Sequence, residues 1–187
     1  MLELLAWAQG VPELETITLW PLSTENLDRD DGDLEPLLSV IATTTEQIAA
    51  TGAWCTRVIG CPDRLPADLR RRVQRAVDAT RGITAQTVNI AIAYGGRDEI
   101  VRAAARMAAD QSRAPTSRNA SVPGPTDFSA YLDTAGQPDP DMIIRTSGEQ
   151  RLSGFMLWQA AYAELYFCPT LWPDFTRDDC DQALAHY

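Results

Sequence analysis

Short apolar runs that are typical of buried strands occur at four places along the chain. They span residues 15–22, 54–60, 86–94 and 142–144, and the first three are rich in β-branched and aromatic residues. Their length and composition predict strands rather than segments of buried helix.

Between these runs, apolar residues recur at every third or fourth position, as they do on one face of an amphipathic helix. The pattern predicts helices at residues 1–9, 33–50, 66–80, 95–110, 128–132 and 176–186. Residues 111–126 are rich in Ser, Pro, Asn and Gly, which predicts a surface loop. Because strands and helices alternate, the predicted fold is α/β, with a central, mostly parallel sheet flanked by helices on both faces.

Composition limits the kinds of protein that the chain can be. Its 187 residues suit one domain, spanning 1–187, that is large enough to bury a core. No stretch approaches the roughly 18 apolar residues of a membrane-spanning helix, so we expect no transmembrane segment. A formal net charge of −10 argues against a nucleic-acid partner.

The cysteines and the histidine exclude other kinds of site. None of the four cysteines has CxxC spacing, and the single histidine, His186, is the next-to-last residue. We therefore expect neither a zinc site nor a histidine-based triad. Reduced thiols and a cytoplasmic location are the default expectation.

The strongest chemical signal follows the fourth apolar run. Two arginines frame a glycine-bearing stretch that is rich in hydroxyl groups; these residues are Arg145, Thr146, Ser147, Gly148, Arg151 and Ser153. Guanidinium groups bind phosphate oxygens bidentately, and hydroxyl and N–H groups bind the remaining lone pairs, so the stretch suits a phosphate or diphosphate. Surface arginines in a polar loop are the alternative. Glu164, inside an aromatic run, needs a partner, and a metal ion that bridges to phosphate is one candidate.

A second polar stretch, Ser23 to Asn26, directly follows the first apolar run. In open α/β sheets ligands bind just beyond the carboxyl ends of strands, so this stretch is a candidate binding segment. An ordinary helix cap followed by a turn would give the same pattern. Likewise, Gly95 and Gly96 after the third run fit a tight turn between a strand and a helix.

Together, these stretches resemble a known family. The strings RTSGEQRLSGF, WQ, AELYF and WPDF occur in that order after Ile144, while STEN and YGGR occur earlier. They resemble the cis-prenyltransferases, or (Z)-isoprenyl diphosphate synthases, a family that includes undecaprenyl diphosphate synthase. The resemblance implies that family's fold and a Mg²⁺-dependent condensation of isopentenyl diphosphate with an allylic diphosphate, forming a cis double bond.

The resemblance also implies a role for individual residues. Asn26, with Ser23 beside it, would assist removal of a proton from the isopentenyl substrate. The substrate diphosphates would be bound by Thr24, Glu25, Arg29, Arg145, Arg151, Leu152 and Ser153. Glu164 would share in the metal site across the interface of a homodimer. Arg97 and Glu99, beside the glycine turn, are interpreted as structural.

An apolar tunnel would hold the growing chain. The candidate lining residues are Leu27, Leu34, Leu37, Leu38 and Ile41, although core packing explains the same side chains equally well. Two departures from the long-chain pattern, Leu27 and the Arg29-Asp30 pair, are more like the short-chain actinobacterial branch that makes (Z,E)-farnesyl diphosphate. With bulky residues in the tunnel helix, they predict a product of about 10 to 15 carbons.

Two segments of the family pattern have no counterpart in the sequence. Nothing before Leu19 resembles the family's first strand and the aspartate segment that binds Mg²⁺, and its C-terminal tail has no counterpart after Tyr187. We therefore expect a portion of a longer enzyme, which would be inactive alone. Three functions are open: a regular short-chain synthase, an irregular synthase that joins two dimethylallyl units head-to-middle, and a non-catalytic partner subunit.

Overall fold

The computed structural model describes residues 1–27, 34–113 and 122–187. Its strands are β1 (Thr16–Leu19), β2 (Cys55–Gly60), β3 (Thr87–Ile92), β4 (Met142–Arg145) and β5 (Glu164–Phe167). Its α-helices are α1 (Leu2–Ala8), α2 (Thr24–Leu27), α3 (Leu34–Ala50), α4 (Ala67–Ala79), α5 (Gly96–Arg113), α6 (Pro125–Ser129) and α7 (Arg177–His186). Short 3₁₀ turns occupy Pro62–Arg64, Gln159–Tyr162 and Trp172–Asp174.

The α/β fold predicted from the sequence is confirmed, and the predicted strands lie within a few residues of their expected bounds. The short helix expected at 128–132 is misplaced, because α6 begins at Pro125 and ends at Ser129. Pro125 suits a first helical position, and the Asp127 carboxylate accepts the Gly124 N–H at 2.8 Å, which fixes the earlier start. Helix α5 also runs further than predicted, to Arg113. The sequence reading missed α2 and β5.

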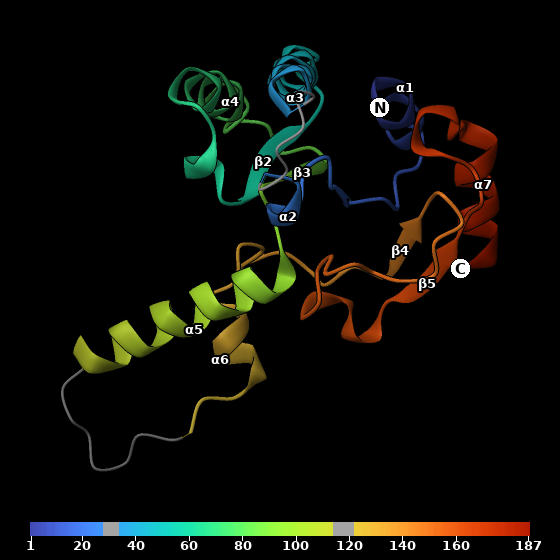
Figure 1. Cartoon of the computed structure of the whole chain (residues 1–187). Coiled ribbons are helices and arrows are strands. Elements are labelled where there is room, and N and C mark those ends of the chain that lie inside the picture. Colours follow the sequence, from blue (N-terminus) through green and yellow to red (C-terminus); the bar gives the residue numbers. More distant parts are fainter. Residues whose placement is uncertain (28–33, 114–121) are drawn as a thin grey trace.

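One parallel sheet of three strands forms the centre of the fold, in the order β1-β3-β2. Strand β3 lies in the middle, and Val88 through Ile92 are all buried, as their almost continuous apolar run requires. Helices α3 and α4 pack side by side over β2, while α5 and α6 lie on the other side of the sheet (Figure 1).

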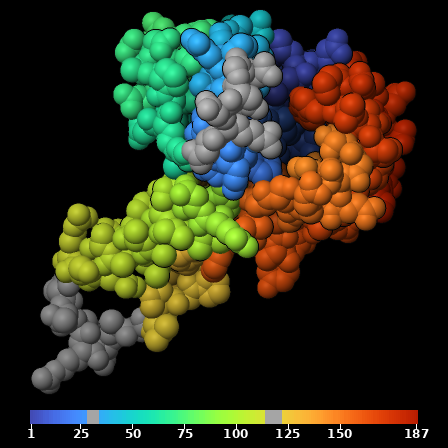
Figure 2. Space-filling view, viewed as in Figure 1, coloured from blue at the N-terminus to red at the C-terminus, as the bar shows by residue number. Residues whose placement is uncertain are grey.

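The core lies between the central sheet and the helices on the α3 side. Its largest fully buried apolar side chains include Trp54, Leu22 and Ile48. Helix α1 packs against α7, and the Trp7 Nε1 donates to Asp181 at 2.9 Å. The two chain ends therefore lie at one side of the molecule (Figure 1), whereas α5 projects from the opposite side, as the space-filling view shows (Figure 2). Among the described helices, none combines the length and the apolar character needed to cross a membrane.

The sheet is divided into two parts, whereas the sequence predicted one continuous sheet. Strands β4 and β5 pair in parallel with each other, and in the described part of the chain no strand joins them to β1. A cavity of about 480 Å³ borders β1 and β4, with Leu19 from β1 and Ile144 from β4 among its lining residues. The cavity therefore lies between β1 and β4, which one continuous sheet would have joined.

Candidate active site

The polar turn after β1 is held against the end of β3. Ser23 bridges to Tyr94, whose carbonyl oxygen accepts the Thr24 N–H at 3.1 Å. The Ser23 Oγ accepts the Asn26 N–H at 3.2 Å, so this stretch is indeed a capped turn. The Asn26 side chain is half-buried and makes no hydrogen bond with the described residues, which leaves its amide available to a ligand. The capped turn is therefore observed, and the binding role of this stretch stays a prediction.

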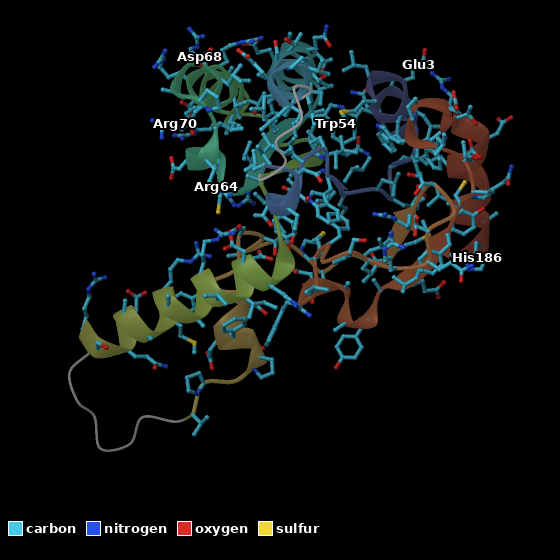
Figure 3. All side chains as sticks on the ribbon, in the orientation of Figure 1. Glu3, Trp54, Arg64, Asp68, Arg70 and His186 are labelled. Atoms are coloured by element: carbon cyan, nitrogen blue, oxygen red, sulfur yellow. The ribbon has the colours of Figure 1, made fainter. Side chains whose placement is uncertain are left out.

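Glu25 remains an anion in this turn. A hydrogen bond from its own backbone N–H, then bonds from the Ser23 and Thr24 hydroxyls, hold the pKa of this carboxyl below its usual range. The nearby charge of Arg64, labelled in Figure 3, lowers that pKa further. An ionised carboxylate repels a diphosphate, so direct diphosphate binding by Glu25 would need a cation between them. Arg29, expected to bind the same group, lies outside the described residues.

The loop after β4 contains strained backbone. Four non-glycine residues in the described chain have a positive φ: Ala93 at 49°, Ser147 at 75°, Ser153 at 51° and Met156 at 44°. Two of them are the serines of the predicted diphosphate loop, and Ala93 directly precedes Tyr94. Residues in this conformation persist only where their surroundings enforce it, and they gather at ligand-binding sites.

Side chains, rather than the backbone, are available to an anion in the first part of this loop. The Ser147 N–H donates to the Thr170 carbonyl at 2.8 Å, and the Gly148 N–H donates to the Cys168 carbonyl at 2.9 Å. Both N–H groups are therefore already bonded. The exposed Ser147 hydroxyl and the neighbouring guanidiniums are left to meet phosphate oxygens.

The two arginines of the loop differ in their partners. Arg151 is exposed and forms an ion pair with Glu149. Arg145 has no acidic partner among the described residues, and its Nε is buried without a hydrogen bond. Because a buried guanidinium N–H without an acceptor is costly, Arg145 needs an anion or a polar ligand. It also lines the cavity between β1 and β4.

Most of the side chains around this cavity are apolar. Trp20 and Phe155 stack in its wall, with their ring centroids 5.1 Å apart. The remaining lining residues are Met1, Thr18, Leu19, Pro21, Leu37, Val40, Ile41, Thr44, Thr45, Ile90, Ile143, Ile144, Arg145, Thr146, Leu152 and Trp172. A cationic group beside an apolar cavity suits a ligand with an anionic head and a hydrocarbon tail.

The predicted tunnel residues divide between the cavity and the core. Leu37 and Ile41 line the cavity, and Ile41 also belongs to the buried core. Leu38 is buried in the core instead, and Leu27 and Leu34 pack against that core, so these three are not among the lining residues. The sequence reading missed Trp20 and Phe155, because neither lies on the helix from which the tunnel was inferred.

Glu164 lies far from Arg145 within one chain. In the β4–β5 register Glu164 pairs with Met142 and Arg145 with Phe167, so they occupy opposite ends of the strand pair. Three residue steps along a strand separate these ends by roughly 10 Å. The described residues contain no group of three or more acidic, His or Cys side chains that could hold a metal ion. The single histidine, His186, lies on α7 at the C-terminal end of the chain (Figure 3).

Known proteins resemble this chain along its whole length. The family model described as putative undecaprenyl diphosphate synthase matches residues 1–187. Isoprenyl transferase 1 of Streptomyces avermitilis is 42% identical over 191 residues, covering 99% of this chain and 72% of that protein. The (2Z,6E)-farnesyl diphosphate synthase of Mycolicibacterium smegmatis is 42% identical over 189 residues, again covering 99% of this chain and 72% of the relative.

A solved structure shows the same architecture. Lavandulyl diphosphate synthase from Lavandula x intermedia, in complex with dimethylallyl diphosphate, superposes with a TM-score of 0.89 at 31% identity. The match covers 99% of this chain and 80% of that one. The resemblance inferred from the sequence is thereby confirmed: this chain belongs to the cis-prenyltransferases, the family of prenyl-transferring enzymes that includes undecaprenyl diphosphate synthase.

Proposed function

We propose that this chain condenses isopentenyl diphosphate with a short allylic diphosphate and forms a cis double bond in a product of roughly 10 to 15 carbons. The observation that carries the proposal is Arg145, which has no acidic partner among the described residues and lines an apolar cavity of about 480 Å³. That volume lies near the lower end of ligand pockets, which favours a short prenyl chain.

The proposed roles follow from what each side chain leaves free. Arg145, with Arg151 and the hydroxyls of Thr146 and Ser153, would bind the isopentenyl diphosphate and hold its charge close to the cavity. The half-buried Asn26 side-chain amide would orient the carbon that loses a proton, and the bond from the Asn26 backbone N–H to the Ser23 Oγ would hold the residue in place. Because the Leu152 side chain lines the cavity, its contribution to diphosphate binding would come from its backbone.

Mg²⁺ is the proposed cofactor, and the chemistry of the donor set allows it. Magnesium in proteins is commonly held by one or two carboxylates together with substrate phosphates and water, so a cluster of three protein ligands is not required. Glu164 is an exposed carboxylate at the start of β5 and would be one ligand. The ion would supply positive charge to a departing diphosphate.

A homodimer would bring Glu164 to a second copy of the loop after β4. Within one chain these groups lie at opposite ends of β4 and β5. In the described chain β5 pairs only with β4, and the nearby Tyr162 is 97% exposed and Leu165 40% exposed. A free strand edge beside exposed apolar side chains is suited to an interface between copies. The cytoplasmic location stays a prediction.

A regular condensation is favoured over the irregular one. Irregular coupling of two dimethylallyl units is the second candidate because of the structural similarity to lavandulyl diphosphate synthase. The M. smegmatis relative named as a farnesyl diphosphate synthase is the more similar in sequence, at 42% against 31%. The available Asn26 side chain, to which the resemblance gives proton removal, also supports the regular reaction. The non-catalytic subunit is least favoured because Asn26, Arg145 and Arg151 are all retained.

Mass spectrometry of the products tests the proposal. The protein expressed from its complete gene is incubated with Mg²⁺ and either dimethylallyl plus isopentenyl diphosphate or dimethylallyl diphosphate alone. A linear product found only in the mixed reaction supports the regular synthase. A branched ten-carbon product from dimethylallyl diphosphate alone would instead identify the irregular enzyme. If neither reaction yields a product, and farnesyl diphosphate as primer yields none either, the protein is not a synthase.

A further inference from the structure

Glu99 is a buried carboxylate to which the proposed reaction assigns no role. It lies in the first turn of α5 and is 0% exposed. None of the described arginines pairs with it: Arg102 and Arg106 on the same helix bind Asp133 instead, at 2.8 and 3.1 Å. A buried carboxylate without a cation is tolerated only where hydrogen-bond donors surround it, so the identity of its donors shows what it stabilises.

The donors to Glu99 come from three separate segments. The Tyr94 hydroxyl, at the end of β3, donates to one carboxylate oxygen at 2.5 Å. The Asp133 N–H, after α6, donates to the other at 2.9 Å. The Gln159 Nε2 lies 3.2 Å from both oxygens and also donates to the Thr134 hydroxyl at 2.9 Å. One carboxylate therefore joins the end of the central sheet to the segment that follows the diphosphate loop.

Tyr94 connects this network to the turn after β1. Its carbonyl oxygen accepts the Thr24 N–H at 3.1 Å and the Trp20 Nε1–H at 3.2 Å. Its ring packs edge-to-face against both Trp20 and Phe155, each with centroids 6.3 Å apart. Burial, and after it the Glu99 charge, raises the pKa of the Tyr94 hydroxyl, which therefore stays protonated and keeps donating.

The glycine turn that follows Tyr94 reaches the other side of the candidate site. The Gly96 N–H donates to the carbonyl of Gly154, the residue that directly follows Ser153, at 2.8 Å. A Cβ on Gly95 would lie 2.6 Å from the Thr24 Oγ1, so this turn also fits closely against the Ser23–Asn26 turn. The short segment 94–96 thus contacts both parts of the site at once.

We propose that Glu99 is a positioning residue that, through Tyr94 and Gln159, sets the placement of the Ser23–Asn26 turn relative to the Arg145–Ser153 loop without contacting either substrate. The inference rests on the proposed function, because it concerns alignment of the two segments that would hold the reactants. Misplacement of reacting groups by about 1 Å can cost as much as 100-fold in rate.

Two conservative substitutions and a control test the proposal in the protein expressed from its complete gene. Tyr94→Phe removes one hydroxyl, and Glu99→Gln replaces one acceptor oxygen with an NH₂ group that faces the donors of Tyr94 and Gln159. Thr80→Val is the matched control, because the Thr80 hydroxyl is a buried acceptor for the Thr56 N–H at 3.0 Å, at the opposite end of β2 from the site. All three are expected to lower the melting temperature.

Kinetics below the melting temperatures separate positioning from mere stabilisation. We expect Tyr94→Phe and Glu99→Gln each to lower kcat roughly tenfold, with KM for isopentenyl diphosphate within about threefold, while Thr80→Val keeps the parent kcat. The double variant should lose little more than the worse single variant, because both act on one network. A kcat equal to that of the parent in both single variants would overturn the proposal. If Glu99→Gln does not fold, Tyr94→Phe decides the question.

A second readout does not depend on turnover. In ¹H–¹⁵N spectra, the Thr24 and Phe155 amide signals should shift in Tyr94→Phe and stay in place in Thr80→Val. If the parent makes no product but these shifts occur, the proposed function fails and the positioning role stands. Unchanged signals would refute the positioning role whether or not the parent is active.

Discussion

Replacing Gly96 with alanine should destabilise the protein, because the turn leaves no room for a Cβ at this position. Gly96 is the first residue of α5, and its N–H donates to the Gly154 carbonyl at 2.8 Å. A Cβ at this position would lie 2.6 Å from that same carbonyl oxygen and 2.9 Å from the Leu157 Cγ. Such contacts are far below van der Waals distance, and one of them involves backbone, which cannot rotate away.

The magnitude follows from three effects. Overpacking costs roughly 1–3 kcal/mol, and loss of the Gly96–Gly154 hydrogen bond costs about another 1 kcal/mol. Against these, alanine favours the helical conformation over glycine by roughly 0.5–1 kcal/mol. We therefore expect Gly96→Ala to lower the free energy of unfolding by about 1–3 kcal/mol, and to lower kcat/KM because the Gly154 carbonyl next to Ser153 has to move.

Urea unfolding, followed by circular dichroism, measures this difference. Gly82→Ala is the control, because a Cβ on Gly82 meets no atom within 4 Å. That variant should be as stable as the parent or more stable by about 0.4–1 kcal/mol, since alanine restricts the unfolded chain. If Gly96→Ala is as stable as Gly82→Ala, the close approach of α5 to the Gly154 turn does not constrain the site.

Three further predictions test other residues. Arg145→Ala should raise KM for isopentenyl diphosphate roughly 10- to 100-fold in steady-state kinetics. The urea midpoint should change little, because Arg145 pairs with no acidic side chain among the described residues and its removal breaks no ion pair there. Leu37→Ala should lengthen the product seen by mass spectrometry at little cost in stability, since Leu37 lines the cavity and is 38% exposed; Leu38→Ala, in the core, should cost about 2–5 kcal/mol without changing product length. If product length responds to Leu38 but not to Leu37, the cavity is not the tunnel. The backbone N–H of Thr176 and then its hydroxyl lower the pKa of Asp179, so its stabilising effect is present above its ordinary pKa of 3.8 and is lost as pH falls; the difference in urea midpoint between the parent and Asp179→Asn should therefore narrow below pH 3.8, and a constant difference would contradict this role.

The sequence by itself determined the features that depend on neighbouring residues. Apolar runs and helical spacing predicted the α/β fold, because the spacing of apolar residues along a strand or helix shows which of its faces is buried. Arg145 and Ser23–Asn26 could be recognised as candidate binding segments because each directly follows an apolar strand, where parallel sheets place their ligands. The ordered motifs around them sufficed to indicate the family.

Only the tertiary structure decided which of several equivalent residues serve the site. The α3 sequence presents Leu37 and Leu38 with the same chemistry, yet one lines the cavity and the other enters the core, because the direction of each depends on what packs against the helix. Strand register places Glu164 at the far end of the β4–β5 pair from Arg145. Contacts between distant segments place Glu99 against the Tyr94 hydroxyl. Gln159 and Glu99, for example, are 60 positions apart in the chain, so no local pattern can encode their contact.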